Sequence, residues 1–410
     1  MIAFHSSYRN LGGVEQFVLL LSRELQLQGV PHKFLGPADS VLWRLMAAHL
    51  PSERLFDTDS LFGWRRAPAN PARRREALTP ADVLLLPNPQ DAVRLRWPNP
   101  RVLSWNVAPE ILLLGKVRPV RWLNRHWKAW MLRHLLARDS LCFMDDVGVR
   151  WLQRTFNVAI ARPALLPVPT VTAERNRFLE RTRNLGAKLT LTYLGRAVDW
   201  KAYPCAHFLN QAAESIVIAQ VHVFTDDAAA FRRLLAGRCV LPAEKLVFHE
   251  NVYEEELKAK LVELADLHFA MGTSALDGAG LGLPTVLIDP FTDPALAHLA
   301  RYRWMYETRC YSLGELITPE NRASFGRPLG ELLRELREDP AGVSARCQDY
   351  VRAHHDLPAI ARRLVELTAR VRARLRSLHV GTALDLLELL PKKLGRSEVT
   401  SPRRRQSVSS

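Results

Sequence analysis

The sequence predicts an α/β protein whose two similar halves, each a parallel sheet with helices on both faces, meet at a central cleft. Three observations support this fold class. Short apolar runs alternate with longer amphipathic segments along most of the chain. The alternation stops in a charged stretch at residues 171–188 and then begins again. The length of 410 residues fits two domains, because one domain usually has about 100–200 residues.

The first half contains five short apolar runs bounded by Pro, Asn, Asp or Gly, as buried strands often are. Gly12-Gly13 separates the first run from a helix predicted at Val14–Gln28, which Gly29 ends. Alternating strands and helices favour a parallel sheet covered on both faces. We predict strands at residues 2–4, 33–35, 83–86, 102–105 and 141–144.

The second half repeats this alternation and ends in helices predicted between residues 329 and 375. A further helix is predicted at residues 383–390, before Pro391. The tail at 392–410 is basic and rich in Ser, so we expect it to be disordered. These boundaries predict domains at 1–172 and 173–376 and a C-terminal segment at 377–410. We predict strands at residues 189–194, 221–224, 246–248, 267–271 and 285–288.

The composition limits the classes of protein and of partner. With 48% apolar and 24% charged residues, the bulk of the chain is outside the disordered class. The net charge of +15 attracts polyanions such as nucleic acid, anionic lipid or phosphorylated substrates. The sequence has no zinc-finger pattern and no aromatic RNA-binding pattern, so we expect no nucleic-acid partner.

The cysteines and the apolar segments indicate the compartment. The five cysteines are scattered, and their odd number and spacing predict neither a disulfide framework nor a structural zinc site. A reducing compartment fits this usage. We find no signal-peptide pattern and no run of about 18 apolar residues. We therefore expect a soluble cytoplasmic protein, with peripheral contact at the inner face of the cell membrane as an option.

The first candidate ligand site is the turn Gly12-Gly13-Val14-Glu15, which follows the first strand. Two glycines permit a tight turn and a close backbone approach to a ligand. The N-terminus of the next helix offers free N–H groups and a positive dipole end to an anion. A tight strand-to-helix turn with Glu15 in the first helical turn explains the same pattern equally well.

The second candidate site follows the strand that ends at Leu194-Gly195. Arg196 and Lys201 lie five residues apart in a loop at the carboxyl edge of the sheet, where both can reach one phosphate group. Arginine suits bidentate contact with phosphate oxygens, and lysine provides a mobile charge. The alternative is a pair of surface cations.

The third candidate site is the stretch from Met271 to Pro284. Gly272, Thr273 and Ser274 offer N–H and hydroxyl groups to a diphosphate at the start of a short helix. One turn later, Asp277 can accept hydrogen bonds from ribose hydroxyls. The alternative for Asp277 is a favourable interaction with the helix dipole.

The three sites, in this order and spacing, resemble the GT-B glycosyltransferases, especially the family 4 (group 1) enzymes of bacterial polysaccharide biosynthesis. Those enzymes carry a GG-x-E turn, then a G-R…K pattern, then an ADL…S…E block that ends in G-x-P. The segment 248–257 is similar to the family's F-x-G-x-V…EEL run. The residues of this chain that match the last block are Ala265, Asp266, Leu267, Ser274, Asp277, Gly282 and Pro284.

The resemblance implies two Rossmann-like domains, the first for the acceptor and the second for a nucleotide-sugar donor. The implied function is transfer of a sugar to a glycan or lipid-linked acceptor in cell-surface polysaccharide synthesis. The nucleotide sugar is a substrate, so no cofactor is expected. By resemblance, Gly12 and Gly13 approach the donor diphosphate, Arg196 and Lys201 neutralise it, Thr273 and Ser274 donate to it, and Asp277 holds the ribose.

The chain also departs from the family. Asp277 stands where relatives have Glu, and Phe269 stands where many have a second Glu. Ser104-Trp105-Asn106 stands where many have a His after a central strand. We therefore nominate no catalytic base, and neither retention nor inversion of stereochemistry is predicted. A binding or scaffold protein with weak or lost activity stays open, as does a nucleotide-sugar epimerase, although no acid–base set for an epimerase is evident.

No Asp-x-Asp metal motif is present. The adjacent pairs Asp145-Asp146 and Asp226-Asp227 are interpreted as loop caps. Arg, Lys and helix N-termini can neutralise a leaving diphosphate without a metal, by preorganised electrostatics. We therefore expect a metal-independent, hexosyltransferase-type enzyme.

The segment Arg118–Arg138 is basic and rich in tryptophan. As a helix, it places Leu123, Trp127, Trp130 and Met131 on one stripe, with Arg121, Arg125 and Lys128 on the other side. This pattern is typical of a helix that lies on an anionic membrane. An amphipathic helix packed on its own domain has the same pattern, and both interpretations stay open.

Overall fold

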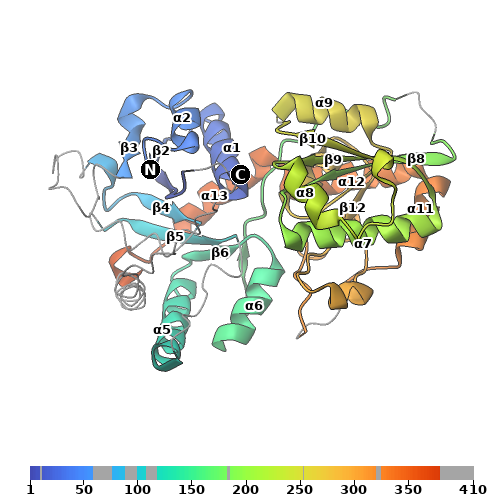
Figure 1. Cartoon of the computed structure of the whole chain (residues 1–410). Helices are drawn as coiled ribbons and strands as arrows, with labels where there is room; N and C mark the ends of the chain where they lie inside the picture. The colour runs from blue at the N-terminus through green and yellow to red at the C-terminus, as the bar shows by residue number, and fades with distance from the viewer. Residues whose placement is uncertain are drawn as a thin grey trace, which may run out of the picture.

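Two sheets, one in each half of the chain, form the fold (Figure 1). The computed structural model describes residues 1–9, 12–58, 76–87, 99–107, 118–181, 185–252, 254–319 and 325–378, with no side chains for 118–124. The two domains lie side by side in Figure 1, and each sheet is flanked by helices. Both sheets are parallel apart from one edge strand of the second, as the alternating pattern predicted.

The first domain has a seven-stranded parallel sheet in its described residues, in the order β3-β2-β1-β4-β5-β6-β7. The five strands predicted in this half are confirmed to within one or two residues. The strands β3 and β7 have only three and two residues, too few for a periodic signal. The strands are β1 Ile2–His5, β2 His32–Gly36, β3 Leu55–Asp57, β4 Val83–Leu86, β5 Arg101–Asn106, β6 Leu141–Phe143 and β7 Ala164–Leu165.

Amphipathic helices cover this sheet. The helix α1 buries Phe17, Val18, Leu21 and Leu25, a spacing that puts one apolar face against the strands. The helix α6 begins at a capping aspartate, Asp145, whose Oδ1 accepts from the N–H of Gly148 at 3.0 Å. The described helices of this domain are α1 Gly13–Leu27, α2 Val41–Ala47, α5 Arg118–Leu136 and α6 Asp146–Phe156.

The second domain has a six-stranded sheet in the order β10-β9-β8-β11-β12-β13, in which only β13 is antiparallel to its neighbour. All five strands predicted here are confirmed, although β11 ends one residue before the predicted Met271. The strands are β8 Lys188–Leu194, β9 Val217–Thr225, β10 Leu246–Glu250, β11 Leu267–Ala270, β12 Thr285–Leu287 and β13 Arg303–Trp304. The helices are α7 Asp199–Ser215, α8 Ala228–Leu235, α9 Glu254–Leu264, α10 Thr273–Gly280, α11 Leu329–Glu338 and α12 Pro340–His355.

After α12 the chain returns to the first domain. The helix α13 (Leu357–Arg370) packs against α1, and the N–H of Val102 donates to the carbonyl of Ala373 at 2.9 Å. Leu375 and Leu378 are buried with core residues of the first sheet. Residues 357–376, which the sequence prediction places in the second domain, thus pack on the first. The helix predicted at 383–390 and the tail at 392–410 lie outside the described residues.

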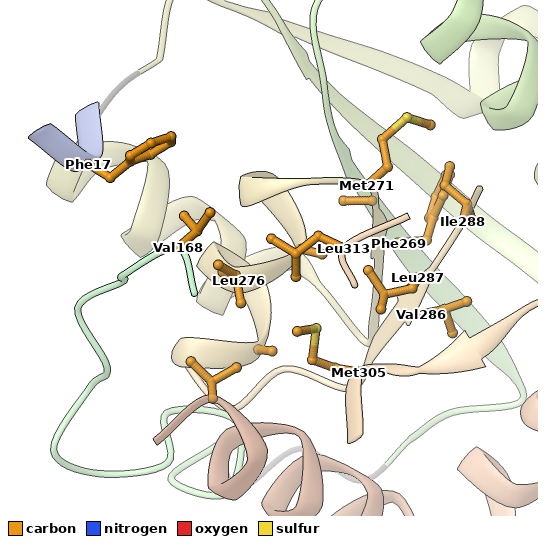
Figure 2. Close-up of a cluster of buried hydrophobic side chains, with 14 of the residues drawn as sticks. Phe17, Val168, Phe269, Met271, Leu276, Val286, Leu287, Ile288, Met305 and Leu313 are labelled. Atoms are coloured by element: carbon orange, nitrogen blue, oxygen red, sulfur yellow. The ribbon is translucent and has the colours of Figure 1, made fainter. Parts of the chain in front are cut away.

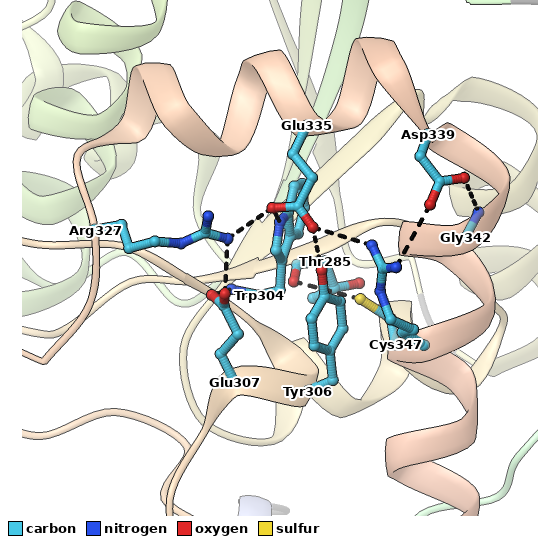
Figure 3. A network of polar contacts seen from close by, with 10 residues as sticks. Thr285, Trp304, Tyr306, Glu307, Arg327, Glu335, Asp339, Gly342 and Cys347 are labelled. Atoms are coloured by element: carbon cyan, nitrogen blue, oxygen red, sulfur yellow. Dashed lines mark hydrogen bonds and ion pairs between the residues drawn. The ribbon is translucent and has the colours of Figure 1, made fainter.

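A polar network around Glu335 of α11 holds the C-terminal helices on the second sheet (Figure 3). Its carboxylate accepts from Trp304 Nε1 at 3.1 Å and from the Tyr306 hydroxyl at 2.8 Å. Arg327 and Arg346 also donate to it, at 2.7 and 3.0 Å. One side chain therefore joins β13, the loop after it, α11 and α12.

The two domains share one apolar core. Phe17 of α1, Val168 of the connection between the domains and Leu276 of α10 belong to the same buried cluster (Figure 2). The cluster continues through Met271 and Leu313 into the second domain. This packing places the N-terminal end of α1 beside that of α10.

Candidate functional site

Two helix N-termini from different domains meet at the boundary between them. Gly13 is the first residue of α1 and Thr273 is the first residue of α10. The Thr273 Oγ1 atom lies 3.9 Å from the position that a Cβ on Gly13 would occupy. The first N–H groups of a helix have no partner within it, and both dipoles present their positive ends here. The arrangement suits an anion such as a diphosphate.

The turn before α1 is held by Glu15. Its buried carboxylate accepts from the N–H of Gly12 and from the Ser6 hydroxyl, both at 3.1 Å. A Cβ on Gly12 would lie 2.8 Å from a Glu15 oxygen. Gly12 and Glu15 therefore shape the turn, as the alternative interpretation predicted, and Gly13 is the glycine that faces α10.

In the turn before α10, the backbone N–H of Gly272 is not available to a ligand as the sequence predicted. Gly272 has a φ of +67°, which glycine tolerates best, and its N–H donates to the carbonyl of Leu313 at 2.7 Å. The prediction that Gly272 offers its own N–H to a diphosphate is therefore wrong, because this group is already bonded. A Cβ on Gly272 would meet nothing within 4 Å. Thr273 and Ser274, which follow Gly272, are the first two residues of α10.

A buried histidine fixes the position of α10. His268 of β11 lies with Nε2 at 3.1 Å from the Ser274 carbonyl and Nδ1 at 2.9 Å from Thr192 Oγ1. Because a carbonyl only accepts, Nε2 carries the proton, and Nδ1 accepts from the threonine hydroxyl. Burial lowers the pKa of His268 to about 4, so the ring is neutral. Gly278 makes this packing possible, since a Cβ there would lie 2.3 Å from the ring.

Asp277 is the fifth residue of α10, beyond the first turn, where the helix dipole has little effect. Burial raises the pKa of its carboxyl to about 6, against a smaller lowering by Lys258 of α9. The side chain is thus a partly desolvated acceptor on the same short helix as Thr273 and Ser274. Such an acceptor suits hydroxyl donors.

Arg196 and Lys201 follow β8, which pairs with β11, so both cations lie at the sheet edge from which α10 starts. The Tyr193 hydroxyl donates to the Lys201 carbonyl at 3.2 Å, and Asp226 accepts from the N–H of Ala197 at 2.7 Å. These bonds shape the loop. Gly195 is required because a Cβ there would lie 2.6 Å from the tyrosine oxygen.

The two cations affect each other. Burial, and then repulsion by Arg196, lower the pKa of Lys201 to about 8, while Asp226 raises it. The Lys201 Nζ atom lies 5.3 Å from the centre of the Trp200 ring, and Arg196 is exposed. An anion bound between the two cations would remove this repulsion.

The structure shows what surrounds Phe269 and Asn106, two of the positions where the chain departs from the family that it resembles. Phe269 lies within β11, fully buried and stacked on Phe208 with ring centres 4.1 Å apart. An acidic side chain there would enter the core and could not reach the site. Asn106, the last residue of β5, is buried, with its Oδ1 2.6 Å from the position of a Cβ on Gly148. It lies at the start of α6, at the carboxyl edge of the first sheet.

The acidic pairs do cap loops, as predicted. Asp145 caps α6, and Asp227 caps α8 through the N–H of Ala230 at 2.7 Å. Sequence reasoning nevertheless missed one feature of Asp145. Its second oxygen, Oδ2, is buried and has no hydrogen-bond partner among the described residues. No sequence pattern distinguishes such a cap from an ordinary one.

The predicted stripe on α5 is wrong in detail. Met131 and Lys128 are both buried, at 6% and 3% exposed, although the pattern placed them on opposite faces. Trp130 is 45% exposed and stacks on His134, with ring centres 5.1 Å apart. The reason is that Met131, Leu132 and Leu135 turn the helix into the core of the first domain. None of the helices in the described part of the chain is long and apolar enough to span a bilayer.

Solved structures of glycosyltransferases share this fold, while no family model and no curated protein matches the sequence. The chain is similar to a glycosyltransferase from Rickettsia africae, with a TM-score of 0.56 and 10% identity over 90% of this chain and 97% of that one. Anabaena HepE, solved with UDP and glucose, gives 0.53 and 12% over 90% and 99%. The lipopolysaccharide outer core galactosyltransferase WaaB gives 0.51 and 10% over 89% and 98%. Together with the two separate α/β sheets, one in each half of the chain, these likenesses identify the chain as having the GT-B fold.

Proposed function

We propose that this chain is a glycosyltransferase that takes a sugar from a nucleotide-sugar donor. One observation carries the proposal: two helix N-termini from separate domains meet at Gly13 and Thr273, beside the edge that carries Arg196 and Lys201. Converging helix N-termini and cations support a site for a diphosphate. The HepE structure, which has the same fold, was solved with UDP and glucose.

The chemistry follows from charge neutralisation. A nucleoside diphosphate leaves a sugar carbon readily once its developing charge is stabilised. The cations and the helix N-termini provide this stabilisation without reorganisation, and each well-placed donor lowers the barrier by roughly 2.7–4 kcal/mol. We therefore propose hexosyl transfer that needs no metal, with Thr273 and Ser274 donating to the diphosphate. Asp277 would hold the ribose, and the sugar would go to a glycan or lipid-linked acceptor of cell-surface polysaccharide.

Thermal stabilisation tests the donor site. UDP-, GDP- and CMP-linked sugars are screened for a rise in melting temperature, and each stabilising donor is then assayed for hydrolysis and for transfer to cell lipid extracts. Arg196→Ala and Lys201→Ala should each weaken donor binding about 10–100-fold, as expected for loss of a charge-assisted contact of roughly 1.5–3 kcal/mol. Unchanged affinity in both variants would refute the phosphate assignment.

A binding protein without turnover is the second candidate. It is favoured by Asn106 and Phe269, which leave the chain without the His and the second Glu of the family. A donor that stabilises the wild type but is never hydrolysed or transferred, with any acceptor extract, would establish this alternative.

We also propose that the enzyme works on the cytoplasmic face of the cell membrane, with α5 in contact with anionic lipid. Trp130 is exposed, stacks on His134 and makes a tilted ring contact with Trp127. Exposed Arg125 and Arg133 flank it, a composition suited to a headgroup layer. Vesicles with anionic lipid should bind the chain, and binding should fall with salt.

The variant Trp130→Ala should reduce this binding several-fold. The matched control is Val240→Ala, which alters an exposed apolar residue of the second domain and should change nothing. Equal binding to neutral vesicles, or none at low salt, would contradict the membrane proposal.

A further inference from the structure

A buried ion pair lies at the carboxyl end of β12, next to the turn at Gly272 before α10, which we call the donor turn. The guanidinium of Arg303 donates to both carboxylate oxygens of Asp289, at 2.9 and 3.0 Å, and the two side chains are 3% and 1% exposed. The strand β12 runs parallel to β11, and the N–H of Ile288 donates to the Ala270 carbonyl at 3.1 Å. Asp289 and Gly272 therefore follow the last paired residues of two neighbouring strands, at the same edge of the second sheet.

Stability alone does not explain an ion pair in this place. Removing two charges from water costs about as much free energy as their attraction returns, so apolar side chains of the same volume often stabilise a fold equally well. The Asp289 carboxylate also has another partner, because its Oδ1 accepts from the backbone N–H of Glu315 at 2.9 Å. The pair thus fixes the backbone of a segment beyond β13, which an ion pair between two side chains does not require.

The segment 313–317 is seated on the end of β12. The N–H of Ile317 donates to the Pro290 carbonyl at 2.8 Å. Gly314 has a φ of +128°, in the region that favours glycine. A Cβ on Gly314 would lie 3.4 Å from both the Ile288 carbonyl oxygen and Pro290 Cδ. The course of this segment therefore depends on a close contact that suits glycine, together with the bond to Asp289.

The first residue of this segment holds the donor turn. The Leu313 carbonyl accepts from the N–H of Gly272 at 2.7 Å. The Leu313 side chain is buried in the same apolar cluster as Leu276 of α10 (Figure 2). Gly272 is the N-cap of α10 and has a φ of +67°. Its conformation sets the direction of the N–H groups that follow it, those of Thr273 and Ser274.

We propose that Asp289 is a positioning residue of the donor site. Through the N–H of Glu315 it fixes the segment 313–317, and through the Leu313 carbonyl this segment fixes the donor turn. Preorganised N–H groups bind an anion without a cost of ordering, whereas a turn that moves must first be ordered. Loss of the Asp289 charge should therefore weaken donor binding although every group assigned to the diphosphate is kept. The inference rests on the transferase function proposed above.

A buried ion pair of the first domain provides the matched control. Lys33 Nζ and Asp82 Oδ2 are 2.8 Å apart, and both side chains are 5% exposed. The Asp82 carboxylate also accepts from a backbone N–H, that of Thr79, at 2.6 Å. Asp82 comes directly before β4, at the amino edge of its sheet and away from the donor turn. Asp82→Asn and Asp289→Asn each leave one buried cation without its charge partner, so both should destabilise the fold.

The first measurement needs no donor. Hydrogen exchange, read by mass spectrometry on peptides that contain Gly272, reports whether its N–H is still bonded. Relative to the amides of β11, exchange at Gly272 should be about tenfold faster in Asp289→Asn than in the wild type, as expected for loss of one hydrogen bond. Asp82→Asn should leave this ratio unchanged.

The second measurement uses the donor identified in the stabilisation screen, at a temperature where unfolding curves show that each variant is folded. The Kd of Asp289→Asn should rise about tenfold, and that of Asp82→Asn should stay within about twofold of the wild type, because its site is remote. A purely structural role of Asp289 would lower the melting temperature of both variants and change neither Kd.

A second variant tests the same inference without touching the ion pair. Gly314→Ala displaces the segment 313–317 from β12, so it should speed exchange at Gly272 and weaken donor binding as Asp289→Asn does. Gly237→Ala is its control, because Gly237 also has a positive φ, of +71°, but a Cβ there would meet nothing within 4 Å. This control should change neither quantity. Gly314→Ala decides the question if Asp289→Asn does not fold.

Unchanged exchange at Gly272 in the folded variants would overturn the inference. So would a donor affinity equal to that of the wild type, or an equal loss of affinity in Asp82→Asn. Each of these results leaves the transferase function intact, because the wild type binds its donor. A wild type that binds none of the donors refutes the proposed function, and this inference fails with it.

Discussion

The side chains of Lys201 and Asp277 carry opposite charges, and burial disfavours the charged form of each. Burial lowers the pKa of Lys201 to about 8 and raises that of Asp277 to about 6. Both residues are therefore most fully charged only between these values. Groups whose environments shift their pKa in this way occur most often at functional sites.

Donor affinity should consequently be highest near pH 7. It should fall below about pH 6, as Asp277 is protonated, and above about pH 8, as Lys201 loses its charge. Lys201→Arg, which stays charged at all accessible pH values, should keep its affinity at pH 9. Isothermal titration calorimetry with the identified donor, at pH values from 5 to 9, measures the affinity of the wild type and of Lys201→Arg. An alkaline loss that is identical in Lys201→Arg would show that another group titrates.

Asp277→Asn should make the protein more stable at pH 7 and at the same time weaken donor binding. The folded-state pKa of Asp277 is raised from 3.8 to about 6, so the ionised carboxylate disfavours folding once the pH rises above 3.8. Removing the charge should raise the free energy of unfolding at pH 7 by up to about 3 kcal/mol. The gain should shrink to zero below about pH 4, while donor affinity falls. Urea unfolding at pH 4 and pH 7 measures the first effect, and a variant less stable at pH 7 would contradict it.

At the scale of elements, the short helix α10 depends on one contact with the strand beneath it. His268 bonds to the Ser274 carbonyl, and Gly278 passes over its ring. Ser274 and Gly278 lie six and ten positions after His268 in the sequence, so strand, turn and helix form one unit.

Gly278→Ala should be destabilising although alanine is the better helix former. Its Cβ would lie 2.3 Å from the buried His268 ring, an overpacking that costs about 1–3 kcal/mol. Gly330→Ala in α11 is the control, because its Cβ would meet only Ser215 Oγ at 3.6 Å. Thermal unfolding should place the first variant below the wild type and the second at or above it. Equal melting temperatures would show that α10 adjusts freely.

At the scale of the whole molecule, the last described elements complete the first domain. The helix α13 lies on α1, and residues 371–378 lie along β5. The first domain is therefore built from two segments of the chain, one before and one after the second domain. Because α13 packs against α1, the helix that begins at Gly13 is also held by residues near the end of the described chain.

A chain ending at Asp356 should lose the first domain selectively. Compared with a chain ending at Leu378, it uncovers the part of α1 that contacts α13 and the buried neighbours of Ala373, Leu375 and Leu378. Calorimetry should show the unfolding transition of the first domain lowered by ten degrees or more, or absent, while that of the second is kept. Equal loss of both transitions would mean that the domains fold as one cooperative unit.

Most strands of both sheets could be predicted from the amino-acid sequence, because buried parallel strands are continuous apolar runs between turn residues. The same pattern places five candidate site residues shortly after predicted strands: Gly13, Arg196, Lys201, Thr273 and Asp277. Three features are visible only in the folded molecule: Gly13 meets Thr273, Gly272 is bonded to Leu313, and Asp145 has a buried oxygen without a hydrogen-bond partner among the described residues. Such facts depend on contacts between residues far apart in the chain. The orientation of α5 and the return of α13 were decided in the same way, by packing against distant strands rather than by local periodicity.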